Sequence, residues 1–148
     1  MSAEQNKAIA RRFIEEVWNN QNLAAVDELY APNAVEHRDL PPFDLDRESA
    51  KQYTAPLFSA FPDVHVTIED MVAEGDTVVT RWIAHGTHQG ELMGITPTGK
   101  TIAVMGISIG RHDANGQLVE SWTTWDRLSM LQQLDINLVL ERAREVGG

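Results

Sequence analysis

The chain has 148 residues, 43% hydrophobic and 23% charged, which is the composition of one globular domain. Its formal charge of −10 includes no basic run, so no contact with nucleic-acid phosphates is expected. The absence of cysteine excludes disulfides and thiol nucleophiles. No membrane span or signal-peptide core is found in the sequence, and a soluble, cytoplasmic protein without a membrane partner is therefore expected.

Helical patterns dominate the first 60 residues. Ser2 and Gln5 have capping-box spacing, and apolar residues then recur every four positions. Asp46 is placed to cap a later helix, which contains Pro56 and should be kinked there. The predicted elements are helices over about residues 3–19, 23–30 and 46–60, a short strand over 33–38, and a loop over 41–44.

From residue 64 the hydrophobic period changes to two, which indicates strands. Turn sequences at 74–76 and 113–116 connect them as hairpins. The predicted strands are 64–73, 77–89, 101–111 and 118–125, followed by a helix that begins at Leu128 and continues through 138–146. The order of these elements predicts a single α+β domain over residues 1–148. In it a curved antiparallel sheet, cone-shaped and barrel-like, packs on the N-terminal helices, with a C-terminal helix and a cavity in between.

Asp126 is the first candidate for catalysis. If no bulge intervenes, it shares a strand face with Trp122, and the two would line one cavity wall. A carboxylate among apolar side chains loses hydration and becomes a better base near neutral pH. The alternative is structural, because Asp126 also directly precedes a helix, where an N-cap belongs.

The histidines allow several interpretations. His85 and His88 face opposite sides of a strand, so a metal site is not predicted. His88 shares parity with Trp82 and could donate a hydrogen bond to a substrate oxygen, whereas the alternative is a histidine satisfied by the backbone. His37 has the same two possible roles on the short strand. His112 lies beside a turn and is expected to be solvated.

Other side chains complete the predicted cavity. Tyr53 offers an orienting hydroxyl, and Met105 is predicted in the wall, with a core role as its alternative. Arg81 and Glu120 lie inside strands, where a cross-strand ion pair is expected for each. The predicted substrate-binding residues are His37, Tyr53, Trp82, Met105 and Trp122, and the predicted catalytic residues are Asp126 and His88, without metal or cofactor.

Three segments in order resemble the SnoaL-like polyketide cyclase family of the nuclear-transport-factor-2-like superfamily. They are residues 60–82, residues 86–100, and VESW at 119–122 with the later Asp126 and LQQL. The resemblance implies a cone fold, and implies that Asp126 is the acid/base group of an intramolecular aldol ring closure without metal or cofactor. The sequence departs from the family pattern at Asp135, where LQQLG reads LQQLD, and at Pro56.

The leading hypothesis is therefore an acid/base enzyme that removes a proton next to a carbonyl of a hydrophobic multi-ring substrate, with His88 or Tyr53 stabilising the enolate. One alternative is a non-catalytic domain that binds a small hydrophobic molecule. Another is an isomerase or dehydratase that uses the same aspartate. A homodimer is also expected, with Ile107 and Ile109 among the candidates for its apolar contact surface.

Overall fold

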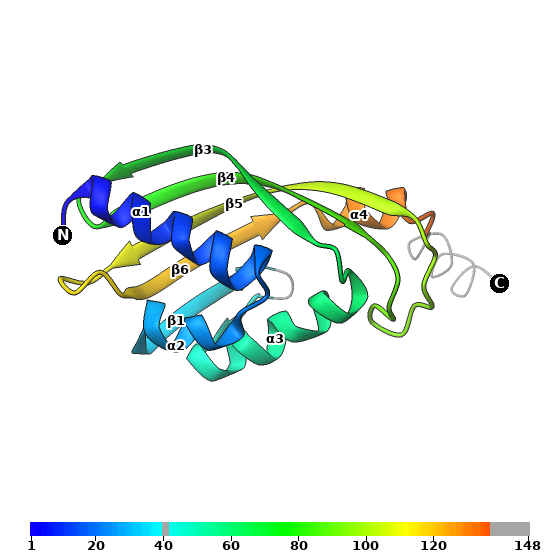
Figure 1. The fold of residues 1–148 in the computed structure, drawn as a ribbon, viewed down its shortest axis with the longest axis horizontal. Coiled ribbons are helices and arrows are strands. Elements are labelled where there is room, and N and C mark those ends of the chain that lie inside the picture. Colours follow the sequence, from blue (N-terminus) through cyan, green and yellow to red (C-terminus); the bar gives the residue numbers. More distant parts are fainter. Residues whose placement is uncertain (40–41, 137–148) are drawn as a thin grey trace.

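The computed structural model describes residues 1–39 and 42–136. Figure 1 shows α1, α2 and α3 on one face of a long curved sheet, with α4 at one end. The elements are α1 (Ala3–Phe13), a π-helical turn η1 (Ile14–Asn19), a 3-10 turn η2 (Leu23–Ala25), α2 (Val26–Leu29), β1 (Tyr30–Asp39), β2 (Pro42–Leu45), α3 (Arg47–Ala60), β3 (His65–Glu74), β4 (Thr77–Thr87), β5 (Thr101–His112), β6 (Leu118–Trp125) and α4 (Arg127–Gln133).

The predicted α+β architecture is confirmed, with two differences in the sheet. The strand order is β2-β1-β6-β5-β4-β3, and β1 pairs with β6 in parallel while all other neighbours are antiparallel. The sheet is therefore mixed rather than wholly antiparallel. It is also open rather than barrel-like, because β2 and β3 are its two edges.

The helix starts follow the predicted capping chemistry. Ser2 and Gln5 form a reciprocal capping box at the start of α1, and the Asp46 carboxylate accepts from the Ser49 N–H at 2.7 Å at the start of α3. The predicted first helix continues past Phe13 as the wider η1 turn. α3 runs through Pro56 as one helix. Residues 42–44 of the predicted loop belong to β2, and residue 41 and the predicted helical stretch 138–146 lie outside the described residues.

The inner face of the sheet and the helices enclose the hydrophobic core. One cluster of buried residues joins Ile14 and Phe61 to Val66 and Val104, and a second surrounds Val17 near α2 and the start of β1. Among the described helices, none combines the length and the hydrophobicity needed to cross a bilayer.

A bulge in β6 decides which residues of that strand face inward. Arg111 pairs with Glu120, whereas the next residue, His112, pairs with Leu118, so Val119 is an extra residue between the two pairs. Leu118 lines the cavity, and beyond the bulge the cavity is lined by Ser121, Thr123 and Trp125. Trp122 and Thr124 consequently face the outer side of the sheet.

Candidate functional site

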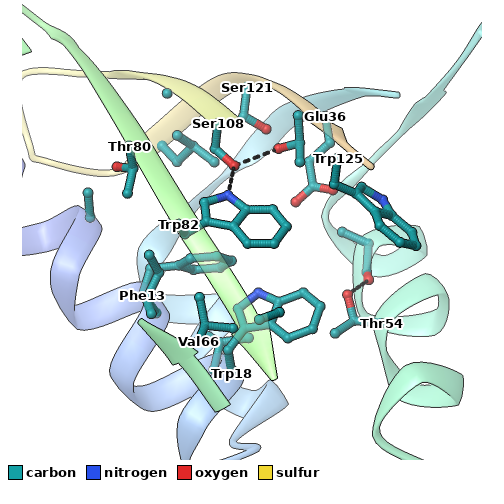
Figure 2. A pocket seen from close by; sticks show the side chains of 18 of the residues that line it. Phe13, Trp18, Glu36, Thr54, Val66, Thr80, Trp82, Ser108, Ser121 and Trp125 are labelled. Atoms are coloured by element: carbon teal, nitrogen blue, oxygen red, sulfur yellow. Dashed lines mark hydrogen bonds between the residues drawn. The ribbon is translucent and has the colours of Figure 1, made fainter. Parts of the chain in front are cut away.

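A cavity of about 180 Å³ lies between the helices and the inner face of the sheet. Its walls are mostly apolar, and Figure 2 shows Phe13, Trp18, Trp82 and Trp125 around it. Such a space suits a hydrophobic ligand, whose orientation would be fixed by the few polar groups in the wall.

Those polar groups lie in register across four strands. Thr80 pairs with Ser108, Ser108 pairs with Thr123, and Thr123 pairs with Arg38. All four line the cavity, and together we call them the polar row. Neighbouring strands are about 4.8 Å apart, so the polar row forms a band of donors and acceptors across an otherwise apolar face.

One hydrogen bond connects the middle of the polar row to Trp82, and a second joins two of its hydroxyls. The Trp82 Nε1–H donates to Ser108 Oγ at 3.1 Å, and the Ser108 and Thr123 hydroxyls are bonded to each other at 3.0 Å. Figure 2 shows these bonds on the sheet side of the cavity. The indole ring is thereby fixed as part of the wall.

Gly106 allows Trp82 to lie flat against the sheet. The two residues are cross-strand partners, and a Cβ on Gly106 would lie 2.2 Å from the Trp82 ring. No side chain fits between them without moving the indole. The position of the Trp82 N–H therefore depends on a glycine in the neighbouring strand.

The cavity also contains one buried ion pair. The Arg38 Nη2 donates to Glu36 Oε2 at 2.9 Å, and the two side chains are only 10% and 9% exposed. The Tyr30 hydroxyl donates to the other carboxylate oxygen, Oε1. Burial, and secondarily the Glu36 charge, raises the pKa of Tyr30 well above its usual range, so the phenol remains a neutral donor. Among the described cavity-lining residues, Glu36 is the sole carboxylate.

Tyr53 lies at the end of the polar row. Its ring is 4.9 Å from Arg38 Cζ in a cation–π contact, and its centroid is 5.8 Å from that of Phe43. Both Tyr53 and Trp82, two of the predicted substrate-binding residues, line the cavity.

His112 lines the cavity near Leu118. It is 5% exposed, so the prediction that it is solvated is wrong. Its N–H backbone group donates to the Asp76 carbonyl, which draws the residue into the β4–β5 pairing. Burial lowers the pKa of the imidazole, which favours its neutral form.

Asp126 lies outside the cavity, which corrects the prediction that it faces the ligand. It is exposed, and its carboxylate accepts from the Ser129 N–H at 3.0 Å as the N-cap of α4. Trp122 and Asp126 both follow the Val119 bulge, and beyond that bulge the residues of their parity point away from the cavity. An exposed, capped carboxylate lacks the desolvation on which the proposed base depended.

His37 and Trp122 lie on the outer face of the sheet, not in the cavity. Their rings are stacked with centroids 5.3 Å apart, and His37 forms hydrogen bonds with Asp44 and Glu120, each 2.7 Å long. Hydrogen bonds to Glu120 first and Asp44 second raise the pKa of His37. Trp122 is 41% exposed. Met105, also predicted in the wall, is 49% exposed, and strand alternation places it on this outer face as well.

His88 is fully buried but does not line the cavity. Its Nδ1 accepts a hydrogen bond from the Thr98 N–H at 3.2 Å. Its backbone N–H donates to the Lys100 carbonyl, and its carbonyl accepts from the Gly99 N–H. These contacts hold the connection between β4 and β5, so the predicted contact with a substrate oxygen is not supported by the geometry. Within residues 1–39 and 42–136, no three His, Asp or Glu side chains gather as metal ligands.

The expected cross-strand ion pairs are present on the sheet. Arg81 bonds Asp70 at 2.6 Å, and Glu120 bonds Arg111 at 3.1 Å. The functional residues that sequence reasoning missed are Glu36 and Arg38, which flank His37 in the sequence. The signal was present, since residues two apart on a strand share a face and Ala34 continues that face as an apolar position.

An open curved sheet that encloses a cavity against N-terminal helices is the fold of the nuclear-transport-factor-2-like superfamily. The sequence matches the SnoaL-like polyketide cyclase family over residues 8–134, and the chain belongs to this family. A comparison with curated protein sequences found no match.

Several solved structures are similar. IdmH from Streptomyces antibioticus, a candidate polyketide cyclase, shares 34% identity over 89% of this chain and 99% of its own, with a TM-score of 0.79. A candidate cyclase from Acidithiobacillus ferrooxidans shares 33% identity over 91% and 98%, with a TM-score of 0.78. AclR from Streptomyces galilaeus, a candidate hydroxylase, shares 25% identity over 90% and 98%, with a TM-score of 0.82. Because this fold carries different activities, the activity has to be argued from the cavity.

Proposed function

We propose that the protein binds a hydrophobic ring ketone in the cavity and transfers protons without a cofactor, as an acid/base enzyme of the polyketide cyclase type. Glu36 takes the role that the sequence suggested for Asp126. The observation that carries this proposal is a buried carboxylate in the wall of an apolar cavity, on the strand next to a row of hydroxyl groups. Family membership supports the same reaction class.

The reaction would begin with removal of a proton from the carbon next to the ketone. The Glu36 carboxylate accepts the proton, and the C–H electron pair forms the C=C bond of an enolate while the carbonyl pair moves onto oxygen. A donor of the polar row stabilises that oxygen. The enolate carbon then attacks a second carbonyl in ring closure, and the oxygen of that carbonyl takes the proton from Glu36; in an isomerisation the enolate instead takes the Glu36 proton at another carbon.

Tyr30 and Arg38 would position the base rather than react. Each donates one hydrogen bond to one carboxylate oxygen, which fixes the orientation of Glu36. A carboxylate has about four lone-pair positions, so two bonds leave room for a proton from the ligand. The charge of Arg38 also compensates the buried negative charge.

Deuterium exchange into 2-tetralone tests this proposal. The ketone has two fused rings and acidic protons next to its carbonyl, and it should exchange them faster in D₂O with the protein than without it. Glu36→Gln should reduce the protein-dependent rate by at least a hundredfold, because a general base contributes about 10² to 10⁴. Asp126→Asn is the matched control and should exchange like the wild type. The reverse result would restore Asp126 as the base.

A non-catalytic binding domain is the second candidate, favoured by the fact that both oxygens of Glu36 already accept hydrogen bonds. In that case Glu36 would only orient the bound ligand or compensate a positive charge on it. The same experiment separates the two functions. Binding of 2-tetralone with labelling equal to that of the protein-free solution would reject the enzyme and retain the binding domain.

We also propose that the outer face of the sheet forms a homodimer contact. Three large apolar side chains are exposed there on β5 and β6, namely Met105, Ile107 and Trp122. The surrounding ion pairs carry both charge signs, which suits contact with an identical copy. Light scattering should give a dimer mass that Ile107→Lys converts to a monomer. A monomeric wild type at high concentration would reject this contact.

A further inference from the structure

We propose that Ser108 and Thr123 act together as the docking point for the ligand's carbonyl oxygen, and that they present one hydroxyl donor to it. This inference rests on the proposed function, since it requires a ring ketone in the cavity. It identifies which members of the polar row supply the donor, and both are residues that bear no charge.

The number of available protons supports one donor. Trp82 Nε1–H, the Ser108 hydroxyl and the Thr123 hydroxyl supply three donors, because indole can only donate and each hydroxyl carries one proton. The two observed bonds use the indole proton and one hydroxyl proton. One hydroxyl proton therefore remains, on Thr123 if Ser108 donates to Thr123, and on Ser108 if the direction is reversed.

The position of this pair suits recognition of a ketone. Both residues line the cavity, and Thr123 neighbours Arg38 while Ser121 neighbours Glu36 on the same strand pair. Glu36 therefore lies in the strand next to Thr123, two residues along from Arg38 on the same cavity face. The surrounding walls are apolar, so a hydrocarbon of the same shape would leave the remaining hydroxyl proton without a partner.

The pair should be redundant. If Ser108 loses its hydroxyl, Thr123 can still donate to the ligand, and if Thr123 loses its hydroxyl, Ser108 can donate instead. Loss of Ser108 also frees the Trp82 N–H, so the donor is removed only when both hydroxyls and this N–H are lost. Strong non-additivity is therefore the signature of this arrangement, and independent ligand contacts would not produce it.

Equilibrium dialysis with 2-tetralone and with tetralin, its hydrocarbon counterpart, tests the inference. The quantity compared is the ratio of the two Kd values. The variants are compared in a Trp82→Phe background, which removes the indole N–H that Ser108→Ala would otherwise free as a new donor. Relative to that background, Ser108→Ala and Thr123→Val should each change this ratio by less than about threefold, whereas the double variant should reduce the ketone preference by about tenfold. Thr124→Val, the same substitution at the neighbouring residue but on the outer face of β6, should leave the ratio unchanged.

The outcomes separate this inference from the proposed function. If neither compound binds the wild type, the proposed function fails and the docking point fails with it. If both bind but the double variant keeps the ratio of the Trp82→Phe background, or one single variant loses the whole preference, only the shared docking point is rejected.

A spectroscopic measurement on the unmodified protein tests the inference even if the double variant does not fold. The carbonyl stretching frequency of 2-tetralone bound to wild type should lie below its value in hexane, because a donated hydrogen bond weakens the C=O bond. A frequency equal to that in hexane would reject the docking point.

Discussion

The ion pairs on the two faces of the sheet differ in their exposure to water. On the outer face, Arg81 pairs with Asp70 where both side chains are at least 40% exposed, so water shares the solvation of each charge. On the inner face, Arg38 pairs with Glu36 where about a tenth of each side chain is exposed, and each charge depends on its partner. The same kind of Arg–carboxylate pair is therefore a surface contact on the outer face and part of the candidate site on the inner face.

The histidines follow the same division. On the outer face, hydrogen bonds to carboxylates raise the pKa of His37, whereas on the inner face burial lowers the pKa of His112. The outer face therefore favours the charged imidazole and the cavity favours the neutral one.

The largest expected effect comes from removing one partner of each ion pair. Arg38→Leu should lower the free energy of unfolding by about 3 kcal/mol, because it leaves the Glu36 carboxylate buried without its cation. Arg81→Leu on the outer face should cost less than about 1 kcal/mol. Urea unfolding of both variants at pH 7 measures the difference. Equal losses would mean that the two faces do not differ in this respect.

A smaller effect is expected from filling the space beside Trp82. Gly106→Ala should cost about 2 kcal/mol, because its methyl group displaces the indole and breaks the bond to Ser108. Adding Trp82→Leu should recover part of that loss, so a double-mutant cycle in thermal unfolding should give a clear coupling energy. Additive effects would contradict the close contact.

A still smaller effect is expected at the exposed end of β6. Asp126→Ala should cost about 1 kcal/mol, since it removes the N-cap of α4. The rate of 2-tetralone exchange in the folded protein should stay at the wild-type value. Circular dichroism melting and the exchange assay on the same sample separate stability from activity. Loss of exchange without loss of stability would return the catalytic role to this residue.

The smallest effect concerns pH on the outer face. Because the folded pKa of His37 lies above its unfolded value, its stabilisation is complete below the unfolded value, near 6.5, and is lost as pH rises through the folded value. His37→Gln should therefore be less stable than wild type at pH 6, by under about 1 kcal/mol, and the gap should shrink at pH 9. A gap that widens with pH would reverse this interpretation.

Local patterns were sufficient to predict most of the fold. The caps at Ser2 and Asp46 and the change of period at residue 64 reflect interactions within a few residues, and the structure has the expected elements there. The parallel pairing of β1 with β6 was not predictable in this way. These strands are about eighty residues apart in the sequence, and neither carries a local signal of its partner.

The site was predicted less well because its side chains depend on strand register. Tyr53 and Trp82 were placed in the cavity, but Asp126 and Trp122 were assigned to the wrong side because alternation was extended across the Val119 bulge. Glu36 and Arg38 were overlooked because attention went to His37 between them. Without the sheet order, nothing in the sequence shows which side of β1 is enclosed.

The extra residue at Val119 also matters for redesign of this protein. If the bulge were lost without a deletion, so that Arg111 paired with Val119 instead of Glu120, the rest of β6 would shift by one residue, and Trp122 and Thr124 would replace Ser121 and Thr123 at the ligand. The amino-acid composition would barely change, yet the cavity would lose its hydroxyl pair and gain an indole. Changes that remove the bulge while keeping the length of β6 are therefore a direct way to diversify ligand preference, whereas deletion of Val119 itself would leave the present faces in place.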